Sequence, residues 1–333
     1  NVSSNTALTY LNISDNELTS LDVSHTNLNT LNCYSNQLTY LNIKTLESQL
    51  NSFNAHNNSL TCIETLDPDW ASATWTENID DGVTFEVICN SEARTIWHVS
   101  TAGSDISGSG TLTSPLSSIQ TAINASTDGD TVSVAAGTYV ENINFSGKNI
   151  SVIGADSSNT IIDGGQNGPV VRFQNGEEQT ALLKNFTLTN GSGYQDGNTT
   201  KGGGVYCYGN MASPTLENLC ITGNQAGQGG GIFSMLGSML VKSSRIIQNT
   251  AEGGGGMWLE GQDGGATIMD SHINHNQAGN GGGVYFYAFN KSTFNNVHIS
   301  HNTATGHGSG CYLTWDSEPK FRQFSISSNT ATN

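Results

Sequence analysis

Two internal repeats of different period constrain the fold of this sequence more than any other feature. Residues 8–18, 28–38 and 50–60 read LTYLNISDNEL, LNTLNCYSNQL and LNSFNAHNNSL, which is a period of 20 to 22 residues. From residue 185 onward a longer unit recurs about every 26 residues. Units of this size bury their apolar faces only by stacking on their neighbours. We therefore expect a mostly β protein built from two solenoids.

The shorter repeat follows the pattern L-x-x-φ-x-φ-x-x-N-x-L, where φ is apolar, and resembles the leucine-rich repeat. Cys33 shares an apolar column with Ile13 and Ala55, which predicts a small buried side chain rather than a reactive thiol. One Asn recurs in each repeat and is expected to form a ladder that satisfies the backbone of the turns. The Asn residues are Asn16, Asn36 and Asn58.

Residues 62–89 follow the third repeat and read CIETLDPDWASATWTENIDDGVTFEVIC. This segment resembles the closing segment of bacterial internalin-like and Bacteroidetes leucine-rich repeat proteins, in which two cysteines bracket a Trp-containing cap. The resemblance implies a disulfide between Cys62 and Cys89 and therefore an oxidising compartment. The alternative is a pair of unrelated free thiols.

Residues 97–126 and 129–165 together resemble the opening of pectin-lyase-like right-handed parallel β-helix domains. In SPLSSIQTAINA, Ser114 and Pro115 are typical of a helix start, and apolar residues follow at helical spacing. Such an N-terminal capping helix would plug the open end of the β-helix. The boundaries that follow are a leucine-rich repeat domain at 1–90, a linker at 91–95 and a β-helix at 96–333. We expect the β-helix to be truncated at its C-terminal end.

The longer repeat has the pattern I-x-x-N-x-A followed by a glycine run and an apolar residue. It resembles the polymorphic outer-membrane protein repeat of chlamydiae, which implies a cell-surface β-helix. The glycine runs hold the same slot in every coil, so they predict a turn column rather than a phosphate-binding loop. The repeated Asn is found at positions 190, 224, 249, 276, 302 and 329.

The formal net charge of −17, with only 11 Lys and Arg, argues against nucleic acid and anionic membrane surfaces as partners. No run of about 18 apolar residues is present, so no membrane span is expected. The chain begins and ends within repeats and carries no signal peptide at Asn1. We interpret it as a mature or trimmed piece of a longer secreted or surface protein, open to continuation or end-to-end self-assembly.

An aromatic residue follows the inward residue of each glycine-run strand, and period-two alternation predicts that it points outward. Such an aromatic ladder suits stacking on sugar rings. The alternative is a ladder that stabilises only the fold through its cross-strand pairs. The candidate ligand-binding residues are Tyr206, Phe233, Trp258, Tyr285 and Tyr312.

Two histidine columns are expected to stack about 4.8 Å apart on adjacent strands. Four close imidazoles could hold Zn, Cu or Ni. The simpler interpretation is a pair of polar columns, because Arg245 and Cys220 share one of them. We therefore assign no metal and no cofactor, with Zn or Ca left as alternatives. The four candidates are His272, His275, His298 and His301.

An enzyme of this fold would need a clustered basic or acidic apparatus. The best lyase candidates are Lys242 and Arg245 in KSSR, but the other cations are scattered over different columns. The paired aspartates of a glycoside hydrolase are missing beside GHG at 306–308.

We therefore expect a non-enzymatic adhesin or recognition solenoid that binds glycan or protein ligands. A polysaccharide lyase or glycoside hydrolase is the first alternative, and a structural stalk or fibre segment is the second. The pairing state of Cys207, Cys220 and Cys311 is left open.

Overall fold

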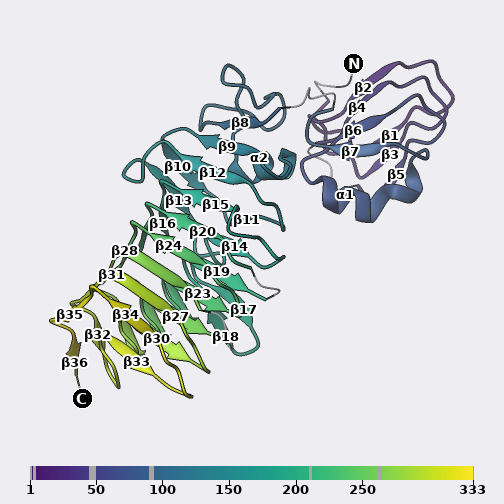
Figure 1. Cartoon of the computed structure of the whole chain (residues 1–333). Coiled ribbons are helices and arrows are strands. Elements are labelled where there is room, and N and C mark those ends of the chain that lie inside the picture. The colour runs from purple at the N-terminus through teal and green to yellow at the C-terminus, as the bar shows by residue number, and fades with distance from the viewer. Residues whose placement is uncertain are drawn as a thin grey trace. The chain divides into compact units, whose positions relative to one another are not determined.

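The computed structural model describes residue 2 and residues 5–44, 50–89, 94–209, 212–261 and 265–332 (Figure 1). By its internal contacts the chain divides into two compact units, one of residues 1–94 and 103–117 and the other of residues 95–102 and 118–333. Segment 103–117 thus packs with the first unit, although it lies beyond the predicted linker. Residues 91–93 of that linker lie outside the described residues. None of the described helices is long or apolar enough to cross a membrane.

The first unit is a stack of three-residue parallel strands in two sheets. Leucines ten residues apart belong alternately to the two sheets, so Leu11 and Leu31 pair in one sheet and Leu21 and Leu41 in the other. One sheet contains β1 (Tyr10–Asn12), β3 (Thr30–Asn32) and β5 (Ser52–Asn54). The other contains β2 (Ser20–Asp22), β4 (Tyr40–Asn42), β6 (Cys62–Glu64) and β7 (Thr84–Glu86).

The predicted Asn ladder of this unit is confirmed. The Asn58 side-chain amide donates to the carbonyl oxygens of Cys33 and Ala55, at 3.1 and 2.9 Å, and its oxygen accepts from the Leu38 amide. Asn36 makes the equivalent bonds one coil earlier. Cys33 is fully buried, and that burial raises the pKa of its thiol to about 12. It is a core residue, as the sequence predicts.

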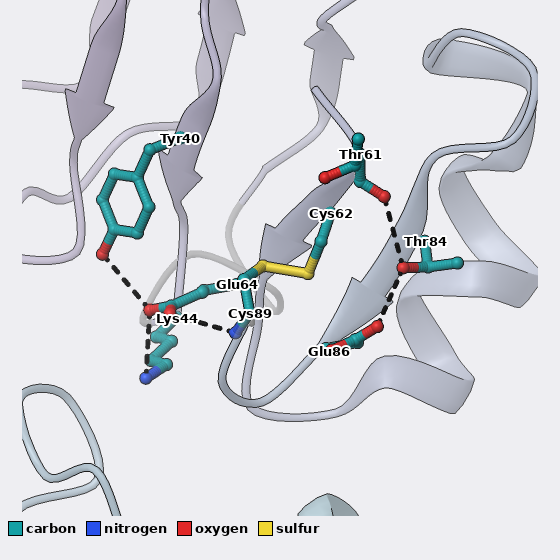
Figure 2. The surroundings of a disulfide bond; sticks show 8 residues. All are labelled: Tyr40, Lys44, Thr61, Cys62, Glu64, Thr84, Glu86 and Cys89. Atoms are coloured by element: carbon teal, nitrogen blue, oxygen red, sulfur yellow. Dashed lines mark hydrogen bonds and ion pairs between the residues drawn. A yellow bond between two sulfur atoms is a disulfide. The ribbon is translucent and has the colours of Figure 1, made fainter. Parts of the chain in front are cut away.

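The disulfide between Cys62 and Cys89 is present and closes a segment that contains α1 (Pro68–Trp75) and η1 (Thr76–Asn78) (Figure 2). Beside it, the Glu64 carboxylate accepts from the Tyr40 hydroxyl at 3.2 Å and from the Cys89 amide at 3.2 Å. Lys44 Nζ lies 3.3 Å from the same carboxylate and is almost fully buried. Burial, and then the charge of Glu64, raise the pKa of Tyr40 to about 12.

The second unit is a parallel β-solenoid whose coils contribute strands to three sheets (Figure 1). In the largest sheet, two rows of short strands both pair with the eight-residue strand β28 (Thr267–Asn274), which joins the rows into one sheet. The next coil repeats this arrangement with β31 (Thr293–Ser300).

The first row of the largest sheet contains β8 (Ile96–Val99), β9 (Thr131–Val134), β12 (Ser151–Gly154), β15 (Leu182–Lys184), β20 (Thr215–Glu217) and β24 (Leu240–Lys242). The second row contains β10 (Gly137–Val140), β13 (Thr160–Asp163), β16 (Thr187–Thr189), β21 (Cys220–Thr222) and β25 (Arg245–Ile247). Beyond β31 follow β34 (Lys320–Arg322) and β35 (Ser325–Ser327).

Two seven-stranded sheets complete the coils. The ladder sheet contains β11 (Ile143–Asn144), β14 (Val171–Phe173), β19 (Val205–Tyr208), β23 (Ile232–Met235), β27 (Met257–Glu260), β30 (Val284–Tyr287) and β33 (Cys311–Leu313). The other contains β17 (Tyr194–Asp196), β18 (Thr199–Lys201), β22 (Gln225–Gln228), β26 (Thr250–Gly253), β29 (Gln277–Asn280), β32 (Thr303–Ala304) and β36 (Thr330–Ala331).

A second Asn ladder runs along the turns before the β22–β36 sheet. The Asn249 amide nitrogen donates to the Asn276 side-chain oxygen at 3.0 Å, and the Asn249 side chain donates to the Ile221 carbonyl oxygen at 2.9 Å. Five of the six predicted turn Asn residues belong to it. The sixth, Asn190, does not, because Leu188 pairs with Ile221 and places Gly191 opposite Asn224.

The expected helix is present as α2 (Ile119–Ala125), but it starts later than Ser114 and Pro115 predict. Ser118 is its N-cap, with its side chain accepting from the Thr121 amide. The Glu141 carboxylate also accepts from the Ile119 and Gln120 amides, each at 2.9 Å. These acceptors satisfy the amides that a helix start leaves free, so they fix the start at residue 119.

Candidate ligand-binding surface

The register of the aromatic ladder is confirmed by the strand pairing of the ladder sheet. Each ladder residue is the direct partner of the next one, from Tyr206 through to Tyr312. The same column continues one coil further back to Arg172 on β14, which pairs with Tyr206. The ladder therefore starts with a cation.

The expectation that the whole ladder faces solvent is wrong. Tyr206, Phe233 and Trp258 are only 3%, 0% and 7% exposed and form an apolar cluster of their own. Tyr285 and Tyr312 at the far end are partly buried. The ladder side chains point away from the coil interior, as predicted. Their burial therefore requires other residues that cover them from outside the coil.

Two features cover the ladder. The antiparallel hairpin of β17 and β18 lays the Tyr194 ring 4.9 Å from the ring of Tyr206, and Lys201 Nζ lies 5.1 Å from the centroid of Phe233. Further along, the Trp258 ring packs over Gly253, where an added Cβ would lie 2.6 Å from the ring. Gly253 must lack a side chain because the indole occupies that space.

Exposed apolar side chains are instead found where the ladder strands end and the loops begin. We call this row the loop edge. Its members end or follow the strands β19, β23, β30 and β33, and the Phe289 amide donates to the Trp315 carbonyl oxygen at 2.8 Å. The Trp315 ring lies 6.1 Å from Tyr287, which in turn lies 5.5 Å from Trp258. The loop edge consists of Tyr208, Leu236, Phe289 and Trp315, with Trp315 the most exposed at 67%.

Three residues of the loop edge have a left-handed backbone. The φ angles of Leu236, Phe289 and Trp315 are 64°, 60° and 53°. Bulky L-residues rarely adopt this conformation, which costs roughly 1–2 kcal/mol per residue. Glycine or asparagine would fit these turns better. Exposed, strained and apolar side chains contribute little to folding, so a ligand is the simplest reason for their presence.

Polar groups flank the loop edge and are held in place by local hydrogen bonds. The indole nitrogen of Trp258 donates to the Glu260 carboxylate at 3.1 Å. The Ser317 hydroxyl donates to the Thr314 carbonyl oxygen at 2.7 Å, and the Glu318 amide donates to Asn290. Carboxylates and hydroxyls next to aromatic rings can accept and donate hydrogen bonds to a sugar.

Two pockets flank the β17–β18 hairpin, and both use its Gln195 and Thr200. One measures about 530 Å³ and is lined by amides and hydroxyls together with Glu252. The other measures about 450 Å³ and is lined by Arg172, Tyr194 and neutral polar residues, with no Asp or Glu. Both volumes fall in the range of small-ligand sites.

The four candidate histidines form two separate stacked pairs. The rings of His272 and His298 lie 5.0 Å apart, and those of His275 and His301 lie 5.1 Å apart. Burial, and then the charges of His298 and Arg245, lower the pKa of His272. Across the described ranges, no group of three or more His, Cys, Asp or Glu is arranged to hold a metal. The predicted stacking of both histidine columns is confirmed.

The lyase candidates lie at the end of one strand and the start of the next, since Lys242 ends β24 and Arg245 begins β25. Lys242 Nζ lies 2.8 Å from the Glu217 carboxylate, which also accepts from Lys184 at 2.9 Å. These two lysines lower the pKa of Glu217 through their hydrogen bonds. Arg245 is exposed and pairs in register with His272. Lys242 is thus engaged in an ion pair.

The three cysteines of the second unit are free thiols. Cys207 is fully buried and its sulfur donates to the Ala212 carbonyl oxygen. Burial raises the pKa of Cys207 and of Cys311 to about 12, so neither is a reactive thiolate. Cys220 is partly buried.

Sequence reasoning did not identify Arg172 or Tyr194 as site residues. One signal was available, because the first spacing of the turn Asn is 34 residues where the others are 25 to 27. The extra residues form the β17–β18 hairpin that covers the ladder and borders both pockets. Trp315 and Phe289 gave no periodic signal, since they lie in loops that differ between coils.

The comparisons with known proteins concern mainly the second unit. A family model described as "Right handed beta helix region" matches residues 150–331. No curated protein matches the chain. Among solved structures, the chain is similar to a pectin methylesterase from Aspergillus niger, with 14% sequence identity over 73% of this chain and 87% of that chain. The TM-score of 0.35 is too low for this likeness to indicate a function.

Proposed function

The chain belongs to the right-handed β-helix family, and we propose that its loop edge is the glycan-binding surface of a secreted or cell-surface recognition protein. One observation carries the proposal: Trp315 is 67% exposed, lies beside Tyr287 and has a left-handed backbone that tryptophan rarely adopts. An indole at a strained and exposed position supports a role in contact with a ligand.

A glycan fits this surface better than an apolar protein partner. The exposed rings are spaced along the stack by the coil repeat, and a flat aromatic ring packs well on the apolar face of a pyranose. The flanking groups are mostly hydroxyls, amides and carboxylates, among them Ser317 and Glu318. Asp316 and Glu318 lie next to Trp315 in the sequence and would repel an anionic ligand, so the proposed ligand at this edge is neutral.

A binding role rather than cleavage is proposed for the same surface. Supporting it, Lys242 is held in an ion pair by Glu217. The runner-up functions, a polysaccharide lyase or hydrolase and a structural stalk, become outcomes of the test below.

The architecture around this surface is part of the proposal. We assign the first unit to the leucine-rich repeat class on its period and its Asn ladder. The second unit is proposed to be a surface β-helix of the polymorphic outer-membrane protein type, with α2 as its N-terminal cap. In support, α2 contacts β8, β9 and β11 and buries Ile119 and Ile123. The disulfide supports export, because such bonds persist in oxidising compartments.

The test is a glycan-array and polysaccharide-pulldown screen of the wild type and of Trp315→Ala combined with Phe289→Ala. We expect the wild type to retain neutral glycans and the double variant to lose at least tenfold in affinity. Tyr10→Ala is the matched control, since Tyr10 is an exposed aromatic residue in the first unit. No binding by the wild type, or equal binding by the double variant, would reject the proposal and favour the structural stalk.

A further inference from the structure

Arg172 is set apart from most of the other cations of the chain. Lys242 and Lys184 pair with Glu217, and Lys201 pairs with Asp196 at 2.7 Å. In the part of the chain that the structure describes, no hydrogen bond or ion pair reaches the Arg172 side chain, and its Nε is buried without an acceptor. Leaving a buried charged donor unsatisfied costs stability, so a purely structural Arg172 would be poorly placed.

The surroundings of Arg172 have the shape and chemistry of a binding site. The pocket of about 450 Å³ is lined by Arg172 of β14, by the turn at Gln166 to Pro169 and by residues of the hairpin strands β17 and β18. Tyr194 presents a half-exposed ring there, and its position is fixed by stacking on buried Tyr206, with the two ring planes 23° apart. The ring is therefore held ready for a ligand rather than ordered on binding.

The charge balance of the pocket selects an anion. Its lining contains one cation and no carboxylate, in a chain with a formal net charge of −17. The nearby carboxylates are already engaged, Asp196 by Lys201 and Asp163 by the Asn190 side chain at 2.8 Å. A guanidinium in a partly desolvated pocket binds planar oxyanions through parallel hydrogen bonds.

We propose that this pocket binds a singly charged oxyanion group, a carboxylate or a sulfate ester, carried on a sugar. Arg172 pairs with the anion, and Tyr194 packs on the sugar ring. Side chains of Gln166, Asn167 and Gln195 line the pocket and can bond the hydroxyls. The site is separate from Phe289 and Trp315 of the loop edge, because these residues follow β30 and β33, which lie four and five strands along the ladder sheet from β14.

The test uses two matched pairs of probes, glucuronate with its methyl ester and glucose 6-sulfate with glucose, measured by saturation-transfer NMR and calorimetry on the full chain. We expect the charged member of at least one pair to bind and its neutral partner to bind at least tenfold more weakly. Comparison of the two pairs tells carboxylate from sulfate. Equal binding of charged and neutral probes, or no binding of either charged probe, would overturn the proposal.

Variants separate a specific site from general electrostatics. Arg172→Gln should weaken charged-probe binding at least tenfold, and Arg172→Lys should restore part of it. Arg245→Gln removes the same charge from an exposed position and should change nothing. If circular dichroism shows that Arg172→Gln is unfolded, Tyr194→Ala is tested in its place. It should also bind the charged probe at least tenfold more weakly. Equal losses for Arg245→Gln, or full binding by Tyr194→Ala and Arg172→Gln, would contradict the site. If the charged probes do not bind the Arg172 pocket but neutral glycans still bind the loop edge, only this second proposal is rejected.

Discussion

At the residue scale, the buried turn asparagines link the coils, because each side chain both donates and accepts hydrogen bonds. The side-chain oxygen of Asn249 accepts from Asn224 of the previous coil, and its side-chain amide donates to the Ile221 carbonyl oxygen of that coil. Its backbone and side-chain amides also donate to the Asn276 side-chain oxygen of the next coil, so a single residue ties three coils together. Aspartate would lack the donor and serine would lack the reach. The column is retained for hydrogen bonding, since its members are fully or almost fully buried at Asn224, Asn249, Asn276 and Asn302.

Asn249→Ala removes the hydrogen bonds that the Asn249 side chain makes with two backbone groups, the Asn224 amide and the Ile221 carbonyl oxygen. We expect a loss of about 1–3 kcal/mol in the free energy of unfolding of the second unit. Chemical denaturation followed by circular dichroism measures it. Asn295→Ala is the matched control, because Asn295 lies within β31 and outside the buried column, and its effect should stay within about 0.5 kcal/mol. Equal losses from both variants would contradict the role assigned to the column.

Trp315 offers a test of whether binding and stability oppose each other at the loop edge. Trp315→Asn keeps the backbone hydrogen bond from Phe289 and places a residue that tolerates the left-handed conformation. We expect the unfolding free energy to stay level or rise by up to about 1 kcal/mol, while glycan binding falls. A marked loss of stability, seen by thermal denaturation, would instead make Trp315 a structural residue.

The stacked histidines make stability depend on pH. Burial, then His298 and Arg245, lower the pKa of His272 below its unfolded value of about 6.5. The unfolded chain therefore binds more protons in this range, so this contribution is fully present above pH of about 6.5 and is lost as the pH falls through that value. We expect the thermal midpoint of the second unit to drop between pH 7 and 5.

His272→Gln should reduce the drop of the thermal midpoint between pH 7 and 5, because it removes the group that resists protonation. His98→Gln, in the first strand of the same unit, serves as the control and should leave the drop unchanged. If the drop persists in His272→Gln, other groups cause the pH dependence.

At the scale of elements, repetition decides what can be predicted from the sequence. The apolar columns, both Asn ladders and the aromatic register follow from it, because stacked coils place equivalent residues at the same position. The disulfide followed from the resemblance of the closing segment instead. The predicted start of α2 is too early, since the acceptor that fixes it, Glu141, lies far along the chain, directly after β10.

The burial of the aromatic ladder was not predictable from repetition. It depends on one insertion, the β17–β18 hairpin, which interrupts the period and covers Tyr206 and Phe233 from outside. Arg172 lacked a signal for the same reason, because its pocket exists only where that hairpin stands beside β14. The functional candidates therefore lie where the repeat is broken.

The Cys62–Cys89 bond is the covalent constraint on the closing element of the first unit. Replacing both cysteines by serine frees a loop of 27 residues in the unfolded chain and should cost roughly 3 kcal/mol. Fluorescence of Trp75, which is buried beside Phe53 and Phe85, follows the transition in denaturant. Cys220→Ser lies in the second unit and should leave this transition in place. A stability unaffected by the double change would show that packing alone closes the unit.

At the scale of the whole molecule, the regular coils of the two solenoids act as a scaffold. The irregular parts, the loop edge and the hairpin pocket, carry the proposed recognition of neutral and anionic sugars. Rigid stacked coils suit this role, because they hold widely spaced contacts at fixed distances for a long polymer.

The central claim is that this protein binds glycans without cleaving them. The most direct measurement incubates the wild type with the polysaccharide that it retains best. Polymer length is then followed by size-exclusion chromatography and absorbance at 235 nm, which reports unsaturated uronate. The account predicts bound polymer of unchanged length and no rise in absorbance. Shortened polymer or rising absorbance that is lost in Lys242→Ala or Arg245→Ala would contradict it and identify an enzyme.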